Sequence, residues 1–253
     1  MKRVFAASAL IAGLGAGTAQ GGLITPGPTD ASVNWVTPGT GAASAAVESG
    51  EGGVRDEIYM YDGSGLTLVG GKLTTSNGGA NNTSSNVTSS TGGLLIDLGD
   101  TYELNLMQLW GFNRGVGHFG PTRFDFRVAT DPSAVQVVGG SLLVNDISKF
   151  TTIVDDQAAT APSESAGYLG ETYTFDNFDE TTITNLGDND GSVDNLGTGT
   201  VTARYVFLDD LQGVGDFGGR TGLFEFQFYG VPEPGSLALL SLGGLCVLRR
   251  RRG

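Results

Sequence analysis

Two glycine-rich stretches of the chain, residues 113–119 and 216–220, combine aromatic with polar side chains. Aromatic faces stack on the C–H surfaces of a sugar and Arg, Asn and Asp side chains bond to its hydroxyls, so a few such groups together can form a small binding site. The candidate ligand contacts are Asn113, Arg114, His118, Phe119, Asp216, Phe217 and Arg220. A structural role is the alternative for each, because a histidine can satisfy loop carbonyls, a phenylalanine can anchor a loop and an arginine can pair with a surface acid.

The residue types that most catalytic motifs need are scarce. His118 is the single histidine, and the single cysteine, Cys246, lies in an apolar run near the C-terminus. The rest of the chain therefore has no disulfide, no cysteine nucleophile and no cysteine-based metal site. No nucleophile elbow, zinc motif or phosphate loop is present. Acidic residues abound, so a glycosidase with two carboxylates stays open as an alternative, but we expect a protein that is not an enzyme.

The chain is strongly acidic outside its two ends. Six of the 14 basic residues and one of the 27 acidic residues lie in segments 1–21 and 231–253, so the body holds 8 basic against 26 acidic residues, a formal charge of −18. Nucleic acid is not an expected partner, because its binding depends on Lys and Arg contacts to phosphate. Carboxylates are ligands that calcium accepts. The acidic stretch 188–194 is either a partial calcium loop or, as the missing EF-hand spacing favours, a solvated loop.

The segments that position these residues have the sequence pattern of β-strands throughout the body. Residues 124–128 and 224–228 alternate phenylalanine or valine with mostly polar neighbours, and this period of two puts the apolar side chains on one face. Clusters of Gly, Asn, Asp, Ser and Thr between the runs are typical of turns. The expected strands are 57–61, 94–98, 104–110, 123–129, 134–138, 141–144, 172–175, 201–208 and 223–229.

Eight or nine short strands without a sustained 3.6-residue pattern predict an all-β fold, a jelly-roll β-sandwich. One domain over residues 22–230 is expected, with two small domains as the alternative. Residues 77–91 are rich in Asn, Ser, Thr and Gly and are expected to form a loop.

The N-terminus has the pattern of a secretory signal peptide. Lys2 and Arg3 form a basic start, residues 4–14 are apolar, and Gly17 to Ala19 are small residues suited to a cleavage point. We expect residues 1–21 to direct the chain to the Sec machinery and to be removed on export.

The C-terminus joins three features in order. Pro232, Glu233 and Pro234 precede an uncharged apolar run, residues 235–248, and four arginines follow it. The prolines fix extended backbone, the run can sit in hydrocarbon as a short transmembrane helix, and arginines prefer the cytoplasmic side. This order resembles the PEP-CTERM sorting signal of bacterial envelope proteins. The resemblance implies that segment 231–253 holds the precursor in the inner membrane until an exosortase processes it at the triplet. An ordinary membrane anchor is the alternative, although the run is shorter than the roughly 17–25 residues of a comfortable span.

Five short motifs in the body follow one another in a recognisable order. They are YDGSGLT at 61–67, LLIDLG at 94–99, RFDFRVATD at 123–131, ARYVFL at 203–208 and GLFEFQFYG at 222–230. This order resembles the discoidin, or coagulation-factor type C, domain and its galactose-binding-like relatives, over residues 31–230. The body departs from the family in being longer, with insertions near 77–91 and 149–195, and in lacking the tryptophan that usually follows the DG turn.

The discoidin resemblance implies a structural calcium ion and a ligand site in loops at one end of the sandwich. The implied calcium ligands are the side chains of Asp62, Thr67 and Glu225 and the carbonyls of Tyr59, Ser64 and Phe224. Oxygen ligands from both ends of the domain would clamp it shut. The alternative is that Asp62 belongs to a simple β-turn and Glu225 is a solvated strand residue.

Together these patterns predict an exported, exosortase-processed protein of the cell envelope, cell surface or extracellular matrix. Its expected role is that of a non-catalytic binding module for extracellular polysaccharide, attached to the membrane through its C-terminal segment. A structural matrix protein without a defined small ligand is the first alternative, and a glycan-acting enzyme is the second.

Overall fold

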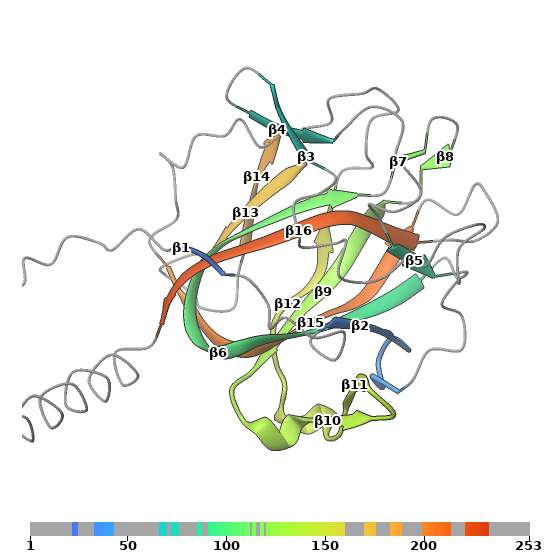
Figure 1. Cartoon of the computed structure of the whole chain (residues 1–253), viewed down its shortest axis with the longest axis vertical. Coiled ribbons are helices and arrows are strands. Elements are labelled where there is room, and N and C mark those ends of the chain that lie inside the picture. The colour runs from blue at the N-terminus through green and yellow to red at the C-terminus, as the bar shows by residue number, and fades with distance from the viewer. Residues whose placement is uncertain are drawn as a thin grey trace, which may run out of the picture.

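The computed structural model of the chain is built from antiparallel strands (Figure 1). The structure describes residues 22–24, 33–42, 66–69, 72–75, 85–87, 91–111, 113–114, 117–118, 120–159, 170–175, 183–188, 199–213 and 221–232. In that part of the chain, the only helical elements are two 3-10 turns, η3 (Pro132–Ala134) and η4 (Ile147–Lys149). No helix among these residues is long and apolar enough to cross a membrane, and the expected transmembrane run, 235–248, lies outside them.

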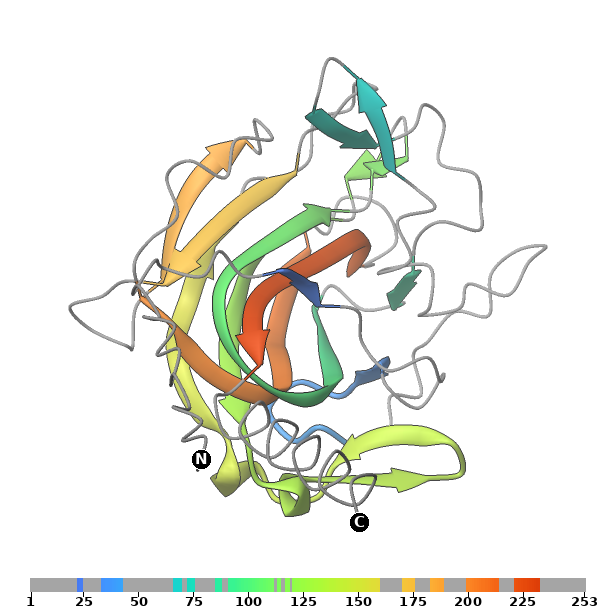
Figure 2. The same ribbon diagram turned by 60° about the vertical axis from the view of Figure 1, so that its left-hand side comes forward.

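One long strand, β6 (Thr91–Gly111), is central to the fold. It is 21 residues long and curves through a U-shaped path in Figure 1 and an arc in Figure 2. Gly99 has φ of 86°, a left-handed conformation that costs a glycine little, and it lies between the two halves of the strand. β6 continues through this point within one hydrogen-bonded ten-stranded sheet that folds over on itself. The first half of β6 lies in one layer, called the first sheet below, and the second half lies in the other layer, called the second sheet.

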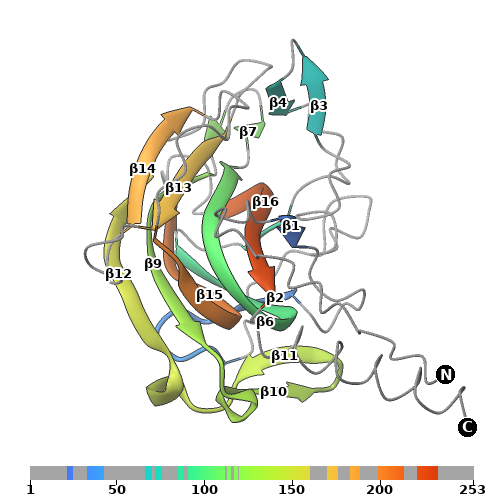
Figure 3. The same ribbon diagram turned by 90° about the vertical axis from the view of Figure 1, so that its left-hand side faces the viewer.

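Each half of β6 has neighbours on both sides. The first half lies between β2 (Val33–Val36) and β15 (Val201–Gly213), and β9 (Pro121–Ala129) and β12 (Thr151–Ala158) follow β15. The second half lies between β16 (Thr221–Pro232) and β13 (Glu171–Phe175), with β1 (Gly22–Ile24) beyond β16 and β14 (Ile183–Asp188) beyond β13. Figure 3 shows both sets of strands from the side. The remaining strands are β3 (Leu66–Val69), β4 (Lys72–Thr75), β5 (Ser85–Val87), β7 (Asn113–Arg114), β8 (Gly117–His118), β10 (Val135–Val138) and β11 (Ser141–Val144).

The apolar faces of the two sheets meet in one core. Phe124 on β9 packs edge-on against Tyr173 on β13, with ring centroids 5.3 Å apart, and Phe126 contacts Phe175 at 5.5 Å. These pairs join strands of different sheets, so they are contacts across a sandwich. The core also includes Phe226 and Phe228, as the alternation along β16 predicts. The predicted all-β sandwich is therefore confirmed.

A second, smaller core covers the outer face of the first sheet. The hairpin of β10 and β11 and the two 3-10 turns pack there against β6, β9 and β15. Phe150, just after η4, meets Phe207 of β15 with ring centroids 5.9 Å apart. The hairpin leaves the sandwich at the end where β9 stops, at Ala129 (Figure 3).

The strand boundaries differ from the sequence prediction in several places, and the predicted strand 57–61 lies outside the described residues. Segments 94–98 and 104–110, predicted as two strands, belong to the single β6, because Gly99 bends the chain without ending its pairing. β5 lies inside the stretch predicted as a loop, 77–91. Ala134, predicted to begin a strand, is the last residue of η3. β16 ends at Pro232 rather than at Tyr229, since a proline is tolerated where a strand ends.

Candidate functional site

The two stretches singled out as ligand contacts leave the sandwich at the same end. β6 ends at Gly111, which pairs with Leu223 near the start of β16. β15 ends at Gly213, which pairs with Pro121 at the start of β9. The segment from β6 to β9 and the segment from β15 to β16 are thus anchored on paired strands. We call this end of the sandwich, with segments 112–120 and 214–220, the loop end.

The first segment contains a short hairpin. β7 and β8 place Asn113 opposite His118, and Arg114 opposite Gly117. The hairpin lies near the right-hand side of Figure 1, where β5 and the start of β16 also lie. Of the other candidate contacts, Phe119, Asp216, Phe217 and Arg220 lie outside the described residues. The strand register thus brings the two segments to one end, and the direct ligand contacts stay a prediction.

The implied calcium ligands are only partly within the described residues. Glu225 lies on β16 opposite Trp110, and its side chain is fully buried, with 0% exposure, rather than solvated. Phe224 precedes it at a register shift in the pairing with β6, and Thr67 lies on β3 opposite Thr74. Tyr59, Asp62 and Ser64 lie outside the described residues. Among the residues that the structure describes, no group of three or more His, Cys, Asp or Glu side chains is arranged to hold a metal.

A second carboxylate, which the sequence analysis did not single out, is buried at this end. Glu171 on β13 lies opposite Leu109 of β6, is 3% exposed, and accepts a hydrogen bond of 2.6 Å from the Tyr173 hydroxyl. A buried carboxylate is costly unless it is hydrogen-bonded or paired, so this bond is needed for its placement. Nothing in the motif Glu171-Thr172-Tyr173 signals burial, because burial results from β6 and β14 lying on either side of β13.

Trp110 fills the space between these groups. Its ring is fully buried, and a Cβ on Gly170 would come within 2.6 Å of the indole Nε1. Gly170 has φ of 71°, so both its conformation and its closeness to Trp110 require glycine. Within the described part of the chain, Trp110 Nε1 and the Thr221 hydroxyl have no hydrogen-bond partner, although both are buried. Several buried polar groups therefore lie on the strands next to the loop end.

An ion pair between Asp97 and Arg204 joins two of the sequence motifs. Asp97 of the LLIDLG motif accepts a hydrogen bond from Arg204 Nε at 3.2 Å, and its Oδ1 also accepts from the Gly99 amide at 2.9 Å. The Arg204 guanidinium lies 5.0 Å from the centre of the Tyr205 ring, a cation–π contact. The ion pair with Asp97 raises the pKa of Arg204. These motif residues thus join β6 to β15 rather than contacting a ligand.

A buried carboxylate on β15 fixes the turn that follows β2. Asp209 is 1% exposed and accepts from the Gly39 amide at 2.7 Å, while Arg127 Nε lies 3.1 Å from its other oxygen. Burial raises the pKa of Asp209, and the Gly39 amide and Arg127 oppose that shift. Asp125 also contacts Arg127 at 3.1 Å, so the Arg127 guanidinium forms ion pairs with both Asp125 and Asp209. The group links β9, β15 and the turn after β2, because Arg127 and the Gly39 amide both contact Asp209.

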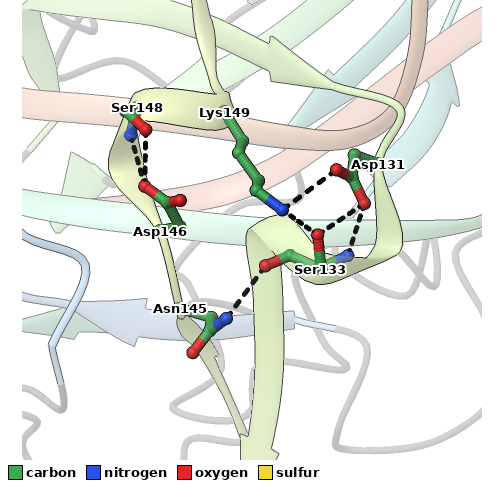
Figure 4. A network of polar contacts seen from close by, with 6 residues as sticks. All are labelled: Asp131, Ser133, Asn145, Asp146, Ser148 and Lys149. Carbon is green, nitrogen blue, oxygen red and sulfur yellow. Dashed lines mark hydrogen bonds and ion pairs between the residues drawn. The ribbon is translucent and has the colours of Figure 1, made fainter.

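A polar network closes the base of the β10–β11 hairpin (Figure 4). Asp131 caps η3 by accepting from the Ser133 amide at 2.8 Å, and Asp146 caps η4 by accepting from the Ser148 amide at 3.0 Å. Lys149 Nζ lies 3.1 Å from Asp131 and also contacts the Ser133 hydroxyl. The hydrogen bonds from Ser133, followed by that from Lys149, lower the pKa of Asp131 to about 2.

Comparison with known proteins identifies the C-terminal signal. Residues 230–252 match the PEP-CTERM protein-sorting motif, so the resemblance of the tail is confirmed and the chain carries the sorting signal of an exported, envelope-associated protein. No curated protein matches the chain.

Several solved structures align with most of the chain. A family 89 glycoside hydrolase from Clostridium perfringens, solved with PUGNAc, aligns over 84% of this chain with 13% identity and a TM-score of 0.40, but the chain spans only 15% of its length. A family 32 carbohydrate-binding module of that hydrolase, solved with GalNAc-beta-1,3-galactose, aligns over 83% of this chain and 100% of its own, with 15% identity and a TM-score of 0.38. The family 32 module of C. perfringens NanJ, solved with galactose, aligns over 83% and 98%, with 11% identity and a TM-score of 0.37. These modules are of the discoidin-like class that the sequence motifs resemble.

Proposed function

We propose that the chain is an exported, non-catalytic binding module that attaches to extracellular polysaccharide through its loop end. The observation that carries this proposal is the strand pairing of Gly111 with Leu223 and of Gly213 with Pro121, which anchors both aromatic and polar segments at one end of the sandwich. Residues far apart in the sequence can then contact one ligand.

The chemistry of these segments favours a sugar over a charged ligand. Asn113 and His118 lie opposite each other on β7 and β8, and Phe119 and Phe217 would add apolar rings next to them. Rings and neutral hydrogen-bonding groups suit the alternating C–H and hydroxyl surface of a neutral polysaccharide. The body charge of −18 disfavours a polyanionic ligand such as nucleic acid.

The proposal includes a structural calcium ion near the start of β16. A fully buried glutamate, Glu225, fits such a role, because a buried carboxylate gains stability from a hard cation beside it. The other donors would be Asp62, Thr67 and backbone carbonyls. Bound there, the ion would link the segment before β3 to the last strand and so stabilise the loop end.

Export and processing complete the proposal. The Sec machinery would recognise residues 1–21, and an exosortase would act at Pro232, Glu233 and Pro234. The processed body would then occupy the envelope or the surrounding matrix, where polysaccharide is found.

Binding by residues 22–232 to a panel of bacterial and plant polysaccharides tests the proposed function. We expect affinity electrophoresis to show retention on at least one neutral polysaccharide. Phe217→Ala or Arg220→Ala should lower the binding affinity at least tenfold, which corresponds to about 1.4 kcal/mol of binding free energy. Thr152→Ala is the matched control, since Thr152 is exposed on β12 and pairs with Arg127, near the end of β9 that lies away from the loop end.

Two outcomes would contradict the proposal. No retention on any polysaccharide, with or without calcium, favours the alternative of a structural matrix protein without a defined ligand. Release of shorter sugars from the panel, abolished by a carboxylate substitution, favours the alternative of a glycan-acting enzyme.

A further inference from the structure

β10 presents an unprotected strand edge. It pairs in regular register with β11, from Val135 opposite Val144 to Val138 opposite Ser141, and with no other strand of the described part of the chain. Val137 and Val138 are 58% and 53% exposed, the two most exposed large hydrophobic residues on the strands apart from Leu23. An exposed apolar edge can pair with a further strand.

The charges that normally protect such an edge are missing here. Residues 132–145 hold no charged side chain, in a body whose formal charge is −18. The flanking acids, Asp131 and Asp146, are engaged in the network at the hairpin base and point their oxygens to Ser133, Ser148 and Lys149 (Figure 4). β10 also has no proline and no bulge, the other usual protections.

The edge is held in place before any partner arrives. β11 is fixed to the sandwich, because the Val144 amide donates to the Gly41 carbonyl at 3.0 Å and the Asn34 side chain donates to the Leu142 carbonyl at 3.0 Å. Gly41 packs so closely on Val144 that a Cβ there would overlap its side chain. A strand that is already ordered loses little entropy on binding.

The turn of the hairpin leaves room for a partner. Gly139 and Gly140 have φ of 63° and 92°, as a tight two-residue hairpin turn requires, and neither has an atom within 4 Å of where a Cβ would lie. The tip of the hairpin therefore carries no side chain that would keep a second strand away from β10.

We propose that β10 pairs in antiparallel fashion with β10 of a second copy of this chain, which joins the two hairpins into one four-stranded sheet. Two bodies of charge −18 repel each other, and this uncharged strand is a place where they can touch with least cost. A twofold axis next to Gln136 and Val137 would place Val135 opposite Val138 of the second copy and bury the exposed valines.

The dimer would be weak and would point both loop ends outward. Four residues a side bury less than the roughly 1,200–2,000 Å² of a stable complex, so we expect association that depends on protein concentration. The hairpin leaves β9 at Ala129, and the loop end begins at Pro121 of the same strand. If the proposed function holds, two such ends would bind one polymer with higher apparent affinity than one, but the dimer itself does not depend on it.

Sedimentation velocity of the full chain in detergent micelles, over a concentration series, tests the dimer. We expect the wild-type protein and Leu23→Lys to shift from monomer to dimer together, because Leu23 is equally exposed, at 54%, but lies on β1. Val137→Lys places a charge on the edge and should stay monomeric throughout. Both positions are exposed, so neither variant should unfold.

Disulfide formation gives a second readout in a Cys246→Ser background. The double variant Val135→Cys and Val138→Cys should give a covalent dimer on oxidation, because the proposed register places these two residues opposite each other, and Leu23→Cys should not. A wild-type protein that stays monomeric, a Val137→Lys variant that still dimerises, or equal cross-linking of the double variant and Leu23→Cys would overturn the proposal. Binding to vesicles of neutral phospholipid that is lost in Val137→Lys, without a dimer, would also overturn it and assign the edge to a lipid surface.

Discussion

At the scale of single residues, four carboxylates are buried among the described residues: Asp125, Glu171, Asp209 and Glu225. Asp209 accepts from the Gly39 amide and lies beside Arg127, and Glu171 accepts from the Tyr173 hydroxyl. Glu225 lies opposite Trp110 on β16. Burial of a carboxylate is costly unless it is paired or hydrogen-bonded, and Glu225 is the residue to which the calcium proposal assigns a bound ion.

The calcium proposal predicts a specific loss in Glu225→Gln. This change keeps the side-chain shape but removes the negative charge that would hold the ion, so the variant should melt at the same temperature in calcium and in chelator. The wild-type protein should melt several degrees higher in calcium, since a ligand that binds only the folded state stabilises it by about 2.7 kcal/mol at a hundredfold excess over Kd. Differential scanning calorimetry of residues 22–232 measures both.

Glu171→Gln is the matched control for that experiment. It also removes a buried carboxylate from the second sheet, but Glu171 is already bonded to Tyr173, so its variant should keep the calcium-dependent shift. The site would be wrong if the wild-type protein melted equally in calcium and in chelator, or if both variants lost the shift.

At the scale of elements, alternation and register explain how much the sequence could predict. β9 and β16 were predictable because their phenylalanines repeat every second residue, facing one core. β12 was missed because Asp155 and Asp156 lie in a register shift and Asp156 has φ of 58°, which breaks the alternation. The register of β13 beside β6 depends on distant contacts, so the burial of Glu171 could not be inferred. The loop end, in contrast, follows from which segments connect the predicted strands.

The hairpin base predicts a pH-dependent stability. The pKa of Asp131 is lowered from its ordinary value of 3.8 to about 2, first by hydrogen bonds from Ser133 and then by Lys149. A lowered pKa in the folded state means that the ionised form stabilises the fold. That contribution is therefore present above pH 3.8 and is lost as the pH falls toward 2.

Asp131→Asn should accordingly be less stable than the wild-type protein at neutral pH, and the difference should shrink steadily below pH 3.8. Urea unfolding over this pH range gives the free energy of unfolding of both proteins. Asp100→Asn is the control, because it removes one exposed carboxylate on β6 that lies outside the network in Figure 4. A constant difference between Asp131→Asn and the wild-type protein at all pH values would contradict the assignment.

At the scale of the whole molecule, charge separates the sorting segment from the body. Four arginines follow the apolar run, while the body carries a formal charge of −18. The sorting motif begins at residue 230, and β16 continues to Pro232, which pairs with Tyr102 of β6. The folded body and the signal therefore overlap by three residues, 230–232, with no linker between them.

Removal of the C-terminal segment tests whether the sorting signal is processed. In a host that makes an exosortase, we expect the wild-type protein to lose its C-terminal segment, because residues 230–252 match the sorting motif and its triplet begins at the last residue of β16. The double variant Glu233→Ala and Pro234→Ala lies beyond β16 and should leave the fold intact but keep the tail, so the protein should stay in the membrane fraction. Intact-mass measurement of both fractions reports the cleavage.

Val231→Ala, a change inside β16 that leaves the triplet unaltered, should be processed like the wild-type protein. Equal processing of the double variant, or a wild-type protein that retains residues 235–253, would show that the segment acts as an ordinary membrane anchor.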